Sequence, residues 1–199
     1  MTLTEPYIKR WTRAEFYQLG ESGYFEGKRA FLLDGEIFEM PAQGNWHALA
    51  IELADNVVRP VLPQPIRFRI QSPLEGPNAG SDPEPDIAVV AGEATPDIAS
   101  HPTTARLVIE VADSSLRLDR RKAAAYAAMG VAEYWIENLV DRQLEVHRDP
   151  QPDSSAEYGW RYAKAFTLKP GDRISPLVAP AASIEVARLF PARPPGDTF

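Results

Sequence analysis

LVIEV (residues 107–111) decides the fold: its apolar residues predict a strand that is buried on both faces, yet its fourth residue is a glutamate. Burying a carboxylate is costly unless a cation or a hydrogen-bond donor receives it. The chain must therefore place a partner near Glu110, or the residue has a chemical role. Both possibilities direct attention to the segments on either side of this strand.

The composition is that of a globular protein. The chain has 199 residues, of which 44% are hydrophobic and 25% charged, and a chain of this length can bury roughly 70% of its unfolded surface. It has no apolar run of about 18 residues, which a membrane helix requires, and its start lacks the layout of a signal peptide. We therefore expect a cytoplasmic protein that does not associate with membranes.

Charge and missing residue types limit the chemistry. The chain has no cysteine, so any metal would be held by oxygen or imidazole ligands. Its formal net charge of −7 disfavours broad attraction to nucleic acid but allows a local basic surface. The short motifs of serine hydrolases, P-loop enzymes, dinucleotide-binding enzymes and zinc proteases are absent, which makes those classes poor candidates.

The segment before LVIEV alternates helical and strand patterns. Thr12 and Glu15 have the spacing of a capping box, and Asp34-Gly35 is a dipeptide typical of a tight hairpin turn. Apolar residues then recur every three to four positions until two prolines end the pattern. We expect, in order, a helix over 12–20, a hairpin over 29–40, a helix over 45–59, and strands over 66–71 and 86–90.

The segment after LVIEV predicts a helix that ends at Gly130 and further strands. We expect a helix over 117–129, strands over 131–138, 143–148 and 160–167, and a short helix over 183–190. The middle of the chain thus has the order helix, strand, strand, strand, helix, strand. This order predicts an α+β fold with a mixed central sheet flanked by helices, an N-terminal helix and β-hairpin, and extra C-terminal strands. We expect one domain over residues 1–190 and a flexible tail over 191–199.

Asp86 is the first candidate partner for Glu110 in a functional site. It opens the strand that precedes LVIEV, and paired strands lie about 4.8 Å apart, so the two carboxylates can meet at one cation. Two carboxylates without clustered histidines or any cysteine favour a hard ion such as Mg²⁺ or Mn²⁺. Such an ion could activate water and polarise a phosphoryl oxygen.

The following helix offers a second partner. Asp119, Lys122 and Tyr126 fall at positions i, i+3 and i+7, along one helical stripe. A lysine above the carboxylate pair could stabilise developing negative charge. The alternative is a purely structural ion pair between Glu110 and Lys122. Tyr126 would then pack at the core edge, and His47 would be a helix-start residue without a role as a ligand.

Several segments together resemble the Uma-two family of restriction-endonuclease-like proteins, within the PD-(D/E)XK nuclease superfamily. The resemblance lies in LLDGEIFEMPAQGNWH (32–47), RIQSPL (69–74), DPEPDIAVV (82–90) and LVIEVADSSLRLDRRKAAAYAAMGVAEYWIEN (107–138), and continues through LEVHRDP (144–150) to SPLVAPAASIEVARLF. It covers nearly the whole chain. It implies a PD-(D/E)XK core and a divalent-metal-dependent endonuclease that hydrolyses phosphodiester bonds in nucleic acid, with DNA as the expected substrate.

The resemblance also implies roles for individual residues. Asp86 and Glu110 take the places of the metal-binding pair. The usual lysine position two residues after the glutamate is Ala112 here, and Lys122 matches the lysine that this family supplies from the next helix. Residues expected to support the site are Gln71, Glu84, Asp119 and Tyr126. The alternative function is a non-catalytic module that binds nucleic acid or protein, and a twofold homodimer would suit an enzyme that cuts both strands.

Overall fold

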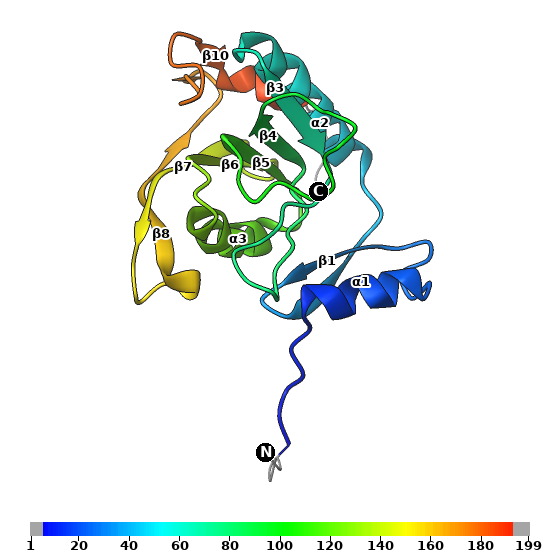
Figure 1. Cartoon of the computed structure of the whole chain (residues 1–199). Coiled ribbons are helices and arrows are strands. Elements are labelled where there is room, and N and C mark those ends of the chain that lie inside the picture. The colour runs from blue at the N-terminus through cyan, green and yellow to red at the C-terminus, as the bar shows by residue number, and fades with distance from the viewer. Residues whose placement is uncertain (1–5, 193–199) are drawn as a thin grey trace.

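A computed structural model, which describes residues 6–192, places the segment 107–111 in the middle of a six-stranded sheet (Figure 1). The helices are α1 (Arg13–Glu21), α2 (Asn45–Val58) and α3 (Leu116–Ala128), with short 3-10 helices η1 (Arg59–Val61), η2 (Glu157–Gly159) and η3 (Val186–Leu189). The strands are β1 (Arg29–Leu33), β2 (Glu36–Met40), β3 (Ile66–Ile70), β4 (Ile87–Ala91), β5 (Leu107–Ala112), β6 (Glu133–Asn138), β7 (Gln143–Pro152), β8 (Trp160–Leu168), β9 (Arg173–Ile174) and β10 (Ile184–Glu185).

The central sheet has the strand order β3-β4-β5-β6-β7-β8. All neighbouring strands in it are antiparallel except β5 and β6, which are parallel. Two consecutive parallel strands need a crossover connection, and α3 provides it. The predicted α+β fold with a mixed sheet is therefore confirmed, and the predicted C-terminal strands extend this sheet as β7 and β8.

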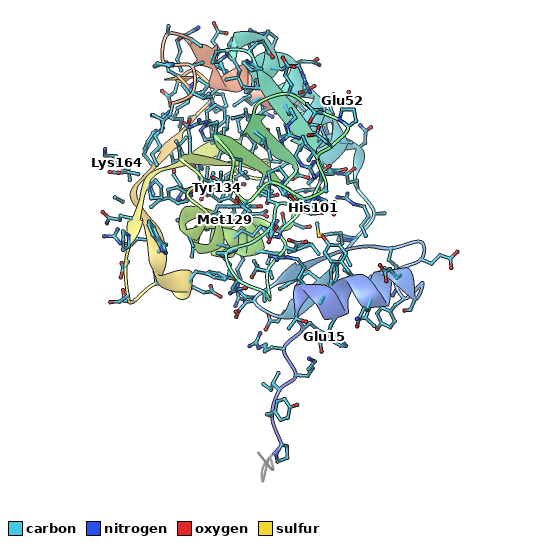
Figure 2. All side chains as sticks on the ribbon, viewed as in Figure 1. Glu15, Glu52, His101, Met129, Tyr134 and Lys164 are labelled. Atoms are coloured by element: carbon cyan, nitrogen blue, oxygen red, sulfur yellow. The ribbon has the colours of Figure 1, made fainter. Side chains whose placement is uncertain are left out.

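Helices cover both faces of the sheet (Figure 1). One face packs against α3, where Tyr126, Val108 and Tyr134 are fully buried. The other face packs against α2 and η3 around Trp135. Figure 2 shows Tyr134 beside α3 near the centre of the molecule, whereas Lys164 projects outward from β8. Because both faces are covered, strands β5 and β6 are buried along their whole length, and any charged residue in them needs a partner.

The N-terminal elements follow the local signals closely. Thr12 and Glu15 form the predicted capping box at the start of α1. Asp34 and Gly35 connect β1 and β2 with φ angles of 50° and 71°, as a hairpin turn with positive φ at both central residues requires. The order α2, β3, β4, β5, α3, β6 also agrees with the predicted order.

Two predictions at the element level were wrong. The segment 183–190 is not one helix: Ile184 pairs with Ile174 of β9, and the chain then continues as η3. The spacing of the buried residues Ile184, Val186 and Leu189 suits this short strand followed by a tight turn. Strand β4 begins at Ile87, so Asp86 precedes the strand and does not open it.

The described structure includes only the first two residues of the predicted C-terminal tail. Of the predicted tail over 191–199, residues 193–199 lie outside the part that the structure describes. Among residues 6–192, no helix has the length and apolar character needed to cross a membrane.

Candidate active site

Glu110 lies in β5 on the face that α3 covers, and only 2% of its surface is exposed. Lys122 of α3 donates a hydrogen bond to Glu110 Oε1 at 3.0 Å, and the Tyr126 hydroxyl donates to the same oxygen at 2.7 Å. The partner that a buried carboxylate requires therefore comes from the helix directly after the strand.

The predicted stripe on α3 forms the rest of this cluster. Lys122 also donates to Asp119 Oδ1 at 3.0 Å, and Ser115 Oγ donates to Asp119 Oδ2 at 2.5 Å. The spacing i, i+3, i+7 places Asp119, Lys122 and Tyr126 on one side of the helix, and all three are buried there. Lys122 is thus held between two carboxylates.

Asp86 lies directly beside Glu110. Its backbone N–H donates to Glu110 Oε2 at 3.3 Å, and its own Oδ2 accepts the Val111 N–H at 2.9 Å. Gln71 Nε2 donates to Asp86 Oδ1 at 3.3 Å. The structure therefore brings Asp86, Glu110 and Gln71 together at the ends of three neighbouring strands.

His47 is a member of this group that the sequence reasoning missed. It lies in the first turn of α2, as predicted, but its Nε2 is 3.1 Å from Asp86 Oδ1. One physical signal was available, because the start of a helix disfavours a positively charged side chain and a histidine there needs a reason. The contact itself depends on how α2 packs across the sheet, which no local pattern reveals.

Burial and neighbouring charges shift the pKa values of the residues in this cluster. Burial raises the pKa of Glu110 to about 8, more than the charge of Lys122 lowers it. Burial lowers the pKa of Lys122, but the carboxylates of Glu110 and Asp119 outweigh it and bring this pKa above its ordinary value. Burial raises the pKa of Asp86, yet the hydrogen bond and charge of His47 leave it below its usual value. A further cation beside Glu110 would hold that carboxyl ionised.

The donor set fits a hard divalent cation. Among the described residues, Glu110 Oε2 accepts only the long bond from the Asp86 backbone N–H, so it keeps an unused lone pair beside Asp86. Within residues 6–192, no three or more histidine, cysteine, aspartate or glutamate side chains form a complete metal cage. A Mg²⁺ ion usually takes one or two carboxylates and keeps several waters, so Asp86 and Glu110 are a sufficient pair.

A cleft of about 720 Å³ opens beside Asp86. Asp86 and His47 line it, and three arginines contribute to its walls: Arg29, Arg117 and Arg121. Arg121 is paired with Glu36, whereas Arg117 has no ion-pair partner in the described part of the chain. The lining of the cleft therefore combines these three arginines with three carboxylates, those of Glu39, Asp86 and Asp113.

Glu84 is the one predicted site residue that points elsewhere. Its carboxylate forms an ion pair with Arg29, one of the residues lining the cleft. Glu84 contacts neither Asp86 nor Glu110 through a hydrogen bond in the described structure. Glu84 therefore holds an arginine in the wall of the cleft and does not contact the carboxylate pair.

Comparison with known families identifies the family of the chain. The model of the family Uma2, described as "Putative restriction endonuclease", matches residues 13–187. The chain belongs to the Uma2 family. The match spans every element from α1 to β10, including all the candidate site residues of this Uma2 protein.

A solved structure has the same fold. It is described as a putative nuclease belonging to DUF820 from Anabaena variabilis, with a TM-score of 0.66 and 16% sequence identity over 90% of this chain and 97% of the other. None of the curated proteins compared with the Uma2 chain matches it. At this identity the solved structure supports the fold alone.

Proposed function

We propose that this Uma2 protein is a divalent-metal-dependent endonuclease that hydrolyses phosphodiester bonds in nucleic acid, with DNA as the expected substrate. One observation carries the proposal: the partly unused Glu110 Oε2 lies against Asp86, which lines a cleft with arginines in its walls. Family membership supports the reaction class, and the geometry supports the assignment of residues.

Asp86 and Glu110 would hold Mg²⁺ or Mn²⁺. When bound, such an ion would activate water and polarise a phosphoryl oxygen. Lys122 is 2% exposed and does not line the cleft, so it positions Glu110 and balances its charge from behind. Asp119 and Tyr126 fix Lys122 and Glu110 in turn, and His47 and Gln71 orient the Asp86 carboxylate.

A non-catalytic module that binds nucleic acid or protein is the second candidate. The observation that favours it is the burial of Glu110, which does not line the cleft itself. Metal-dependent turnover that disappears in a Glu110→Ala variant would exclude this candidate.

The test is cleavage of supercoiled plasmid and of single-stranded DNA with Mg²⁺, Mn²⁺ or a chelator. Asp86→Asn should lower metal-dependent cleavage by about 10²-fold or more because it removes a proposed metal ligand. Lys122→Met should lower it to a similar extent because Glu110 loses the cation that positions it. Asp55→Asn, which changes an aspartate that pairs with Arg59 on α2, is the matched control and should cleave normally. Full Mg²⁺-dependent cleavage by Asp86→Asn would refute the assigned mechanism.

A further inference from the structure

Two arginines lie side by side on β3, the edge strand next to β4. Arg67 is opposite Val90 and Arg69 is opposite Ala88. Residues that face each other on paired strands point to the same side of the sheet, and Ala88 and Val90 belong to the core beneath α3. Both arginines therefore lie on the face of the sheet that carries Glu110.

Neither arginine has a carboxylate partner within residues 6–192. The side chain of Arg67 forms no hydrogen bond or ion pair with any residue in this part of the chain, and its Nε is buried. Arg69 Nε is also buried and unbonded, and its terminal nitrogen donates only to the Pro73 carbonyl at 3.2 Å and to His101 Nδ1 at 3.1 Å. By contrast, Arg120 and Arg148 are each paired with a glutamate.

This arrangement is unfavourable for the free protein. Burial lowers the pKa of Arg69, and the neighbouring charge of Arg67 lowers it further. Like charges at short range repel, and a partly buried charge without a partner keeps its desolvation cost. Both residues retain part of their surface in solvent, so an anion can reach them and relieve both effects.

The pair continues toward the proposed active site. Arg67 and Arg69 lie on one side of β3, about 6.8 Å apart, and Gln71 follows directly after the end of this strand. Gln71, the last of the three, donates to Asp86 Oδ1. A linear polyanion that contacts Arg67 and Arg69 is therefore directed to the carboxylate pair.

We infer that Arg67 and Arg69, with His101 from the loop before β5 (Figure 2), bind backbone phosphates of a nucleic-acid strand and guide it to Asp86. The identity of the ligand rests on the proposed function. Guanidinium groups bind phosphate oxygens through paired hydrogen bonds, and Arg67 has its donors free for such bonds in the described structure. The site reads the backbone and not the base sequence.

Fluorescence anisotropy with a labelled single-stranded oligonucleotide, in chelator so that no cleavage occurs, tests the inference. The double variant Arg67→Gln/Arg69→Gln should bind at least about tenfold more weakly. The slope of log K against log salt should become shallower by about 1.4, because each phosphate that an arginine no longer neutralises reduces it by about 0.7. The matched control is Lys169→Gln/Arg188→Gln, which removes two exposed cations elsewhere and should leave affinity and slope nearly unchanged.

Thermal unfolding separates a binding role from a structural one. Without nucleic acid the double variant should melt at or above the temperature of the wild type, because it loses a repulsive pair that has no carboxylate partner among the described residues. A lower melting temperature, an equal loss of affinity in the control, or no binding of the oligonucleotide by the wild type would each overturn the inference.

A small diester separates this inference from the proposed function. Bis(p-nitrophenyl) phosphate has a single phosphate and cannot reach from Asp86 to Arg67, so the double variant should hydrolyse it with Mn²⁺ as the wild type does. Hydrolysis lost in Asp86→Asn but kept in the double variant supports both proposals. If the wild type does not hydrolyse any diester but the double variant still loses oligonucleotide binding, the nuclease assignment fails and the binding site stands.

Discussion

Glu110 of β5 and Glu133 of β6 are both buried glutamates paired with a cation, yet their surroundings differ. Glu133 accepts short bonds on both oxygens: Oε1 accepts bonds from Trp135 and from Arg148, and Oε2 accepts the Leu177 N–H at 2.6 Å. Glu110 has one oxygen bonded to Lys122 and Tyr126, while Oε2 has only the long contact with the Asp86 N–H.

This difference shows what separates a structural ion pair from a candidate site. Burial and a cationic partner are common to both glutamates and identify neither as functional. The distinguishing features of Glu110 are an oxygen whose one bond in the described structure is long, a second carboxylate beside it and a cleft that Asp86 lines. A metal at Glu133 would have to compete with the short bonds that both of its oxygens already accept.

The largest predicted effect concerns stability. Glu133→Ala should lower the free energy of unfolding by about 3–5 kcal/mol, because Arg148 loses the carboxylate that pairs with it. Glu110→Ala should cost clearly less, since Lys122 keeps Asp119 as a partner and the raised pKa of Glu110 shows that its burial is incompletely compensated. Urea unfolding followed by tryptophan fluorescence measures both values. A larger loss of stability in Glu110→Ala than in Glu133→Ala would contradict this prediction.

A third glutamate, Glu137, sharpens the comparison through pH. Its side chain is fully buried, and neither oxygen has a hydrogen-bond partner among residues 6–192. Burial, and to a smaller extent the charge of Asp86, raises its pKa well above the ordinary value. The folded state therefore keeps a proton that the unfolded state releases, so stability falls as the pH rises above about 4.5.

Glu137→Gln should remove this dependence. The stability of the variant relative to the wild type should increase with pH by up to about 1.4 kcal/mol per unit above pH 5, measured by urea unfolding at pH 5, 6 and 7. Parallel stability curves for the wild type and Glu137→Gln would contradict the prediction.

Local patterns predicted most of the fold because the signals themselves are local. The Asp34-Gly35 turn, the Thr12 capping box and the spacing of apolar residues in α2 each act over a few residues. The prediction of a helix over 183–190 was wrong because the contacts that decide this segment lie outside it. Ile184 pairs with Ile174 outside the segment itself, and η3 packs against α2 from the other end of the chain. A short apolar pattern does not distinguish a helix from a strand followed by a turn.

In the candidate site, too, the contacts set by local spacing were predictable and the long-range contacts were not. The stripe Asp119, Lys122 and Tyr126 was predictable from helical spacing, and its contact with Glu110 follows from a strand connected directly to that helix. The contact of His47 with Asp86 joins residues 39 positions apart. The roles of these residues in metal binding and catalysis stay predictions.

The smallest predicted effect compares two buried tyrosine hydroxyls. Tyr126 donates to Glu110 Oε1 and Tyr162 donates to the Val131 carbonyl at 2.9 Å, and a change to phenylalanine removes only the hydroxyl in each case. Bonds to charged groups contribute about 1.5–3 kcal/mol and neutral bonds about 0.5–1.5 kcal/mol. At pH 9, above the Glu110 pKa of about 8, Tyr126→Phe should therefore cost about 1 kcal/mol more than Tyr162→Phe in urea unfolding. Equal costs would mean that Glu110 is not an ionised acceptor at that pH, and a carboxyl that stays protonated there would be a poor metal ligand.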